Sequence, residues 1–154
     1  GSLMMLLVGF GWAKPVPVNG WRLSRRELLE VALAGPVSNI VMATGAGLAA
    51  RALVLTGSRA LIVVATFLAF FALLNLFLAF FNLIPIAPLD GWKVLMGLVS
   101  AEQARLLARY ETYGPIVLLL VIVLGRSDTF DVFGWLVRTP ATWLLRLLAG
   151  PFFA

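Results

Sequence analysis

The stretch that decides how this chain folds is NLIPIAPLDG, residues 82–91. A long apolar run, residues 60–84, leads directly into it, and its two prolines disfavour a regular helix before one carboxylate, Asp90, is reached. An aspartate at the centre of a membrane helix costs about 2.5–3.5 kcal/mol, so a charge placed there is usually functional. Irregular backbone is tolerated at membrane depth only where protein covers it or where it lines a watery cavity. The stretch therefore indicates a polar site near one face of a helical membrane protein.

Composition supports an integral membrane protein. Of the 154 residues, 62% are hydrophobic and 12% are charged, and the mean hydropathy is +1.02; soluble domains carry about 25% charged residues. The absence of cysteine excludes disulfides and thiolate metal sites, and the absence of histidine excludes imidazole ligands. The net charge of +5 comes from basic residues at the ends of apolar runs. This placement predicts contact with the headgroups of a lipid bilayer and no nucleic-acid partner.

Hydropathy predicts an all-α integral membrane protein with about three transmembrane helices, an N-terminal proline-rich β-loop and an amphipathic C-terminal segment. The β-loop is expected because Pro15 and Pro17 force the residues before them into extended geometry. Near the other end, Pro140 interrupts the amphipathic segment, which is expected to lie in the interface or to cross as a broken helix. The single membrane domain, residues 1–154, divides into the tail of a missing upstream helix (1–8), the β-loop (9–20), transmembrane helices (28–55, 60–84 and 108–125) and the C-terminal segment (133–153).

Small and polar residues mark two helix faces. Four small residues recur every fourth position in the first span, and this spacing predicts a face that another helix approaches closely. Asn39 lies in the middle of that face and is a candidate for a functional polar contact. Asn75 and Asn82, seven apart in the second span, either bond neighbouring helices or, for Asn82, contribute to the site. The small-residue face consists of Gly35, Asn39, Ala43 and Gly47.

The distribution of lysine and arginine predicts the orientation. Seven cationic residues fall on the side of Asp90 and three on the other, so the positive-inside bias places the Asp90 loop on the cytoplasmic side. The first group is Lys14, Arg22, Arg25, Arg26, Lys93, Arg105 and Arg109, and the second is Arg51, Arg59 and Arg126.

Three motifs together resemble one family. N-x-x-P-x-x-P-L-D-G at residues 82–91 resembles the second metal-site motif of the site-2 protease family of intramembrane zinc metalloproteases (M50). A-G-P-x-S-N at residues 34–39 is similar to the middle-helix motif of that family, and G-W-A-K-P-V-P-V-N at residues 11–19 is similar to the preceding loop in bacterial members. The resemblance covers residues 9–97 and implies a bacterial inner-membrane protein.

The resemblance implies a protease that cuts transmembrane protein substrates within the bilayer. Its zinc is held by two histidines of an H-E-x-x-H helix and by the aspartate of the L-D-G motif, which corresponds to Asp90. A carboxylate is a suitable third ligand because a catalytic zinc site keeps its fourth position for water. Asn39 and Asn82 are candidates to bond the substrate backbone or the oxyanion.

The chain departs from the family in lacking histidine, so it cannot make the zinc site alone and is expected to be inactive as written. One interpretation is that it is the C-terminal part of a zinc metalloprotease whose H-E-x-x-H helix lies before Leu3. The alternative is a non-catalytic structural or regulatory subunit that contacts neighbouring membrane subunits and holds no metal. An unrelated transporter fragment would carry inverted repeats, and none is seen in this sequence.

Overall fold

The computed structural model describes residues 24–124, 131 and 133–153, and these residues form helices and connecting turns with no strand among them. The all-helical class is therefore confirmed for this part of the chain. The expected β-loop of residues 9–20 lies outside the described residues. In this described part of the chain, two helices are long and apolar enough to cross a membrane, and the number rises to three if a bent pair is taken as one span.

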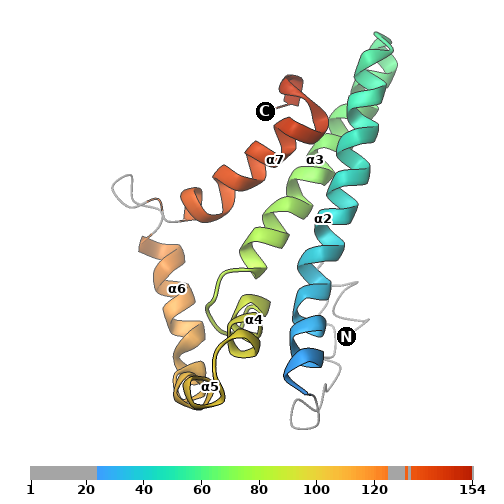
Figure 1. Ribbon diagram of the computed structural model, residues 1–154. Coiled ribbons are helices and arrows are strands. Elements are labelled where there is room, and N and C mark those ends of the chain that lie inside the picture. Colours follow the sequence, from blue (N-terminus) through green and yellow to red (C-terminus); the bar gives the residue numbers. More distant parts are fainter. Residues whose placement is uncertain (1–23, 125–130, 132, 154) are drawn as a thin grey trace, which may run out of the picture.

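The two long helices form an α-helical hairpin that runs the height of the molecule (Figure 1). Helix α2, Arg25–Leu55, starts at a capping box in which Ser24 Oγ accepts from the Glu27 amide and the Glu27 carboxylate accepts from the Ser24 amide. This pair satisfies two amides that a helix start leaves free. Helix α3, Arg59–Asn82, follows after a turn through Gly57, whose φ of 70° suits a residue without a side chain.

Helix α2 continues through Pro36 without a break in its assigned span, and the proline side chain is buried. The expected small-residue face contacts two different elements. Ala43 and Gly47 are buried, and an added Cβ on Gly47 would lie 2.9 Å from Leu148 Cβ of α7. Gly35 is exposed and faces a different neighbour, which belongs to the candidate site described below.

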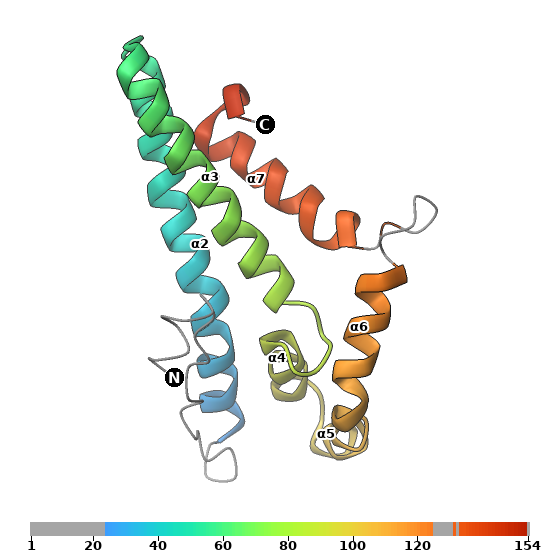
Figure 2. The same cartoon turned by 180° about the vertical axis from the view of Figure 1, so that it is seen from behind.

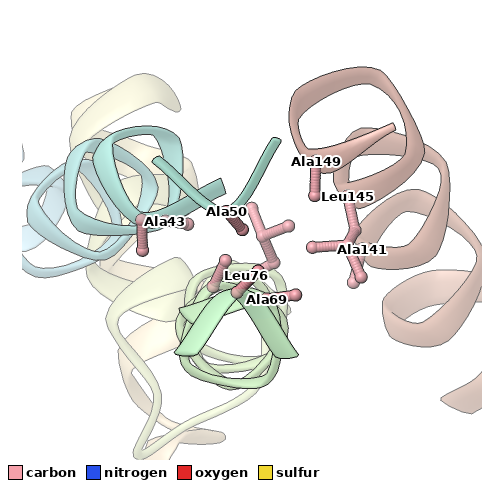
Figure 3. Close-up of a cluster of buried hydrophobic side chains, with 10 residues drawn as sticks. Ala43, Ala50, Ala69, Leu76, Ala141, Leu145 and Ala149 are labelled. Atoms are coloured by element: carbon pink, nitrogen blue, oxygen red, sulfur yellow. The ribbon is translucent and has the colours of Figure 1, made fainter. Parts of the chain in front are cut away.

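The C-terminal segment packs against the hairpin. A π-helical stretch, Gly134–Arg138, continues into α7, Thr139–Ala149, and a short 3-10 turn, Pro151–Phe153, follows. Pro140 lies in the first turn of α7, directly after the π-helical stretch, and the helix continues through it. The buried side chains of α7 point at the hairpin (Figure 3): Ala141, Leu145 and Ala149.

Alanine dominates this core. Ten buried residues form one cluster between α2, α3 and α7, and only two of them, Leu76 and Leu145, are larger than alanine. Small side chains at the interface let membrane helices approach closely and gain van der Waals contact along their backbones. At the far end of α7, Arg51 Nη1 of α2 donates to the Leu147 carbonyl at 3.4 Å.

The remaining helices lie beside the Asp90 end of the hairpin (Figures 1 and 2). Helix α4 spans Asp90–Leu98, and α5 spans Ala101–Ala108. The 3-10 turn Glu111–Tyr113 then leads into α6, Gly114–Leu124, and the axis bends by 45° between α5 and this last stretch. The third predicted span, 108–125, thus corresponds mainly to α6, the apolar member of the bent pair that α5 and α6 form.

Candidate functional site

The NLIPIAPLDG stretch forms a tight loop between α3 and α4. Helix α3 ends at Asn82, and short turns replace the helical ladder: the Ile86 amide donates to the Ile84 carbonyl at 2.8 Å, and the Leu89 amide donates to the Ile86 carbonyl at 3.0 Å. Pro85 and Pro88 offer no amide, so the segment cannot continue as a helix. The loop bonds its own backbone and delivers Asp90 as the first residue of α4.

Gly91 fixes the angle at which α4 leaves this loop. A Cβ at residue 91 would overlap the carbonyl oxygens of Leu83 and Ile84, so any other residue would force the two backbones apart. Gly114, at the start of α6, lies in the same way against the backbone of Ala87. The missing side chains of these two glycines therefore allow α4 and α6 to pack closely against the loop.

The carboxylate of Asp90 lies between α4 and α2. Its Oδ2 is 3.3 Å from the position that a Cβ would take on Gly35 of α2. Its Oδ1 is 3.8 Å from the ammonium Nζ of Lys93, one turn further along α4. The Asp90 side chain is 35% exposed, so it is accessible to a ligand while protein covers most of it.

Within the described residues, the Asp90 carboxylate accepts no backbone hydrogen bond. Three other helix starts among the described residues use a side chain for this purpose: Ser24 and Ser100 belong to capping boxes, and the Gly134 amide donates to Asp131 Oδ1 at 2.6 Å. The residue that caps α4 is Leu89, which has no side-chain acceptor. Among the described residues, the carboxylate of Asp90 therefore has the Lys93 ammonium beside Oδ1, and Oδ2 lies next to Gly35.

The two predicted asparagine contacts lie on α2 and at the end of α3. Asn39 is one helical turn beyond Gly35 on the same face of α2, and it is partly buried. Asn82 ends α3, next to Leu83, which the start of α4 touches at Gly91. Neither amide has a side-chain hydrogen bond to another residue in the described ranges. Asn75 differs, because it is buried and its Nδ2 donates to Phe71 O of its own helix at 2.9 Å rather than to a neighbouring helix.

Trp92 follows the L-D-G motif and carries a buried indole N–H. Among the described residues, Nε1 of this side chain is the only buried side-chain nitrogen or oxygen without a hydrogen-bond partner. A buried donor left unpaired costs about 1–3 kcal/mol. The described structure thus shows no polar contact that would explain why the indole N–H of Trp92 is buried.

The donor set does not complete a zinc site. A catalytic zinc takes three protein ligands, and the described residues contain no group of three histidine, cysteine, aspartate or glutamate side chains that could hold a metal. The whole sequence has no histidine. Asp90 by its chemistry and position suits one ligand, but these 154 residues alone do not fit the metal.

Sequence reasoning missed the pairing of Lys93 with Asp90. The signal was available, because residues three apart on a helix lie on one face. The sequence pattern alone does not require a helix to begin at Asp90, so it does not identify Lys93 as a partner of this carboxylate.

Comparisons with known proteins identify the family of this chain. The profile of Peptidase family M50 matches residues 48–125, a range that includes the whole NLIPIAPLDG loop. "Putative zinc metalloprotease YwhC" of Bacillus subtilis (strain 168) is 36% identical over 132 residues, which are 80% of this chain and 59% of YwhC. "Putative zinc metalloprotease Rip3" of Mycobacterium tuberculosis (strain ATCC 25618 / H37Rv) is 31% identical over 106 residues, 67% of this chain and 26% of Rip3. No solved structure matches the chain.

The family profile covers half of the chain, and the chain spans about three fifths of YwhC and a quarter of Rip3. Its long apolar helices and its proline loop with Asp90 agree with that match. The chain is an integral membrane protein that belongs to Peptidase family M50, the site-2 protease family.

Proposed function

We propose that this chain is the part of an intramembrane zinc metalloprotease that supplies the aspartate ligand of the metal. The observation that carries the proposal is the carboxylate of Asp90, which accepts no backbone bond in the described residues and lies between α4 and the Gly35 face of α2. A carboxylate in a membrane is costly and is kept where it has a function. The relatives YwhC and Rip3 carry zinc metalloprotease names, which supports zinc as the cation.

The chain would hold one side of the reaction centre. Asp90 would be the third metal ligand, and the two histidines and the general base would come from outside these 154 residues. The bound zinc would polarise the scissile carbonyl and activate a water. Asn39 and Asn82, whose amides are uncommitted in the described structure, would bond the unwound backbone of a transmembrane substrate or its oxyanion.

A second candidate function rests on the missing histidines. A chain with no histidine and with a bulky Trp92 beside Asp90 also suits a non-catalytic subunit, in which the Asp90 loop contacts neighbouring membrane subunits and no metal is held. The two functions differ in whether the mature protein carries the H-E-x-x-H sequence.

The deciding experiment is an intact mass with N-terminal peptide mapping of the protein purified from its native membrane. A mass several kilodaltons above 16.7 kDa, with an H-E-x-x-H peptide upstream of Leu3, supports the protease. Zinc content and cleavage of a transmembrane substrate in vesicles are then measured for Asp90→Asn, with Glu30→Gln on the surface of α2 as the control. Cleavage that survives in Asp90→Asn, or a mature chain without histidine, refutes the protease and leaves the subunit.

We also propose that the Asp90 loop faces the cytoplasm of a bacterial inner membrane. The lysine and arginine count supports this orientation, although α7 adds one charge to the opposite side. Arg51 bonds the carbonyl of Leu147, which places the neighbouring Arg146 at the Arg51 end. The count changes from seven against three to seven against four, with Arg138 assigned to neither side, and the bias keeps its sign.

A further inference from the structure

We propose that the Arg51 end of the hairpin binds the headgroups of anionic phospholipids in the leaflet around it. This end consists of the last two turns of α2, the first turn of α3 and the last turn of α7. It carries three exposed arginines, one from each helix: Arg51, Arg59 and Arg146. The inference concerns a surface at the opposite end of the hairpin from Asp90 and needs no catalytic activity.

The three arginines lie at one end of the molecule. Residues 56–58 join α2 to α3, so Arg59 lies at the tip of the hairpin, and Arg51 is about 6 Å of helix before the last residue of α2. Arg51 Nη1 donates to the carbonyl of Leu147, and Arg146 directly precedes Leu147. The C-terminal end of α7 lies beside the upper half of the hairpin in Figure 1, in agreement with this contact.

The length of α3 places this end among the headgroups. Helix α3 has 24 residues and is about 36 Å long, whereas the hydrocarbon core of a bilayer is about 30 Å thick. The first turn of α3 therefore reaches the headgroup region when the helix crosses the membrane. Arginines one or two turns further in reach the same region, because their long side chains extend toward water while the stems stay on apolar surface.

Charge complementarity selects anionic headgroups at this end. None of the carboxylates among the described residues belongs to it. Asp131 pairs with Arg138 at 3.6 Å, about 12 Å of helix before Arg146. The other carboxylates belong to the Asp90 end, where the described cations equal them in number. These carboxylates are Glu27, Glu30, Asp90, Glu102 and Glu111, and the cations are Arg25, Arg26, Lys93, Arg105 and Arg109.

Contacts within the protein leave the three guanidinium groups available. Arg51 uses one of its N–H donors for the Leu147 carbonyl, at 3.4 Å. Arg59 and Arg146 make no ion pair or side-chain hydrogen bond among the described residues. The helix dipole favours Arg146 in the last turn of α7 but opposes Arg59 in the first turn of α3, so the helix itself does not explain Arg59. A guanidinium binds phosphate oxygens through paired N–H donors, which suits a lipid phosphate.

Exposed apolar side chains lie beside these cations. Trp143 is three residues before Arg146, on the same face of α7, and is 65% exposed. Leu55 and Leu147 are also exposed at this end. Tryptophan is enriched at membrane interfaces, because its ring suits the acyl region and its N–H suits the headgroups. Cations next to apolar side chains fit a phospholipid, which presents a phosphate and an acyl chain together.

The test is native mass spectrometry of the full-length gene product in detergent with equal amounts of phosphatidylglycerol, which is anionic, and phosphatidylcholine, which is zwitterionic. The wild type is expected to bind phosphatidylglycerol preferentially. The double variant Arg59→Gln/Arg146→Gln keeps the bond from Arg51 to Leu147 and removes the two uncommitted cations. One basic residue near an anionic surface contributes about fivefold to affinity, so the preference should fall by up to about 25-fold. Lysine at both positions keeps the charge and should restore most of the preference.

A matched control separates this surface from a general effect of charge. Arg105→Gln/Arg109→Gln also removes two exposed arginines, but from the end where carboxylates equal the cations, and it is expected to keep the preference. The unfolding midpoint should be the same for both double variants and the wild type. A wild type without preference for phosphatidylglycerol, an unchanged preference in Arg59→Gln/Arg146→Gln, or an equal loss in the control would each overturn the proposal.

Discussion

A series of glycine-to-alanine variants tests how closely the helices approach one another. The added methyl group is the same at every position, and only its surroundings differ. At Gly45 it meets nothing within 4 Å, at Gly47 it lies 2.9 Å from Leu148 Cβ, and at Gly91 it overlaps two main-chain carbonyl oxygens. The expected order of stability is therefore Gly45→Ala above wild type, with Gly47→Ala below it and Gly91→Ala lowest.

The magnitudes follow from two opposing effects. Alanine in place of glycine stabilises a helix interior by about 0.5–1 kcal/mol. Overpacking costs about 1–3 kcal/mol where a side chain must shift, so Gly47→Ala should be about 1–3 kcal/mol less stable than Gly45→Ala. Backbone cannot yield as a side chain does, so Gly91→Ala should lose about 3 kcal/mol or more.

The assay is thermal unfolding of each variant in one detergent. One kcal/mol moves the midpoint by about 2–4 °C in a protein of this size, so Gly47→Ala should unfold about 2–12 °C below Gly45→Ala. Equal midpoints for these two variants would refute the close approach of α7 to α2. A Gly91→Ala variant as stable as the wild type would refute the tight return of α4 against the end of α3.

Four other predictions address the core, the site and the topology. Leu145 is 2% exposed between α7 and the hairpin, so Leu145→Ala should lower the free energy of unfolding by about 2–5 kcal/mol in the same assay. A loss below about 1 kcal/mol would contradict this packing. Trp92→Phe should unfold no earlier than the wild type, since it removes an unpaired buried N–H, and an earlier transition would reveal an acceptor for that donor. Asn39→Ala and Asn82→Ala should slow cleavage of a transmembrane substrate by the full-length protein. Their unfolding midpoint should stay unchanged, because neither amide bonds another described residue. Normal cleavage by both variants would exclude both residues from substrate binding. Cysteines at Ser100 and Thr56 should react with an impermeant maleimide from opposite sides of the membrane, Ser100 from the cytoplasm, and labelling from one side would contradict a spanning hairpin.

The all-helical class could be predicted because two apolar runs are too long to be anything else in a chain of this composition. The predicted starts of the spans, residues 28 and 60, lie close to the observed starts, Arg25 and Arg59. The earlier start of α2 comes from the Ser24–Glu27 capping box, which extends the helix into a polar turn that hydropathy does not recognise.

Two features could not be obtained from hydropathy. The packing of α7 depends on Ala141, Leu145 and Ala149 meeting alanines far away in sequence, and an amphipathic pattern suits a lipid surface as well as a helix pair. At the start of α6, Gly114 lies against Ala87, and the periodicity of the sequence does not predict this contact. Both contacts join residues that are far apart in the sequence, so no local sequence pattern predicts them.

The candidate site was partly predictable. Asp90 stood out because a charge after a proline-broken apolar run is rare and expensive. The surroundings of that carboxylate were less visible: a small-residue face can serve any helix, and only the fold brings Gly35 of that face to Asp90.

The alanine core has a consequence for how this protein can change over evolutionary time. Its buried positions, such as Ala72 and Ala50, have no room for growth, whereas Phe67 and Phe71 point outward and are 77% and 45% exposed. In most protein cores the large buried residues tolerate substitution least. Here the exposed bulky residues should tolerate exchange for other apolar residues, and the buried alanines should not tolerate substitution. A saturation library selected for folded protein should thus accept Phe67→Leu and reject Ala72→Val. Distant descendants of this gene would then be recognisable by their alanines and glycines more than by their large hydrophobic residues.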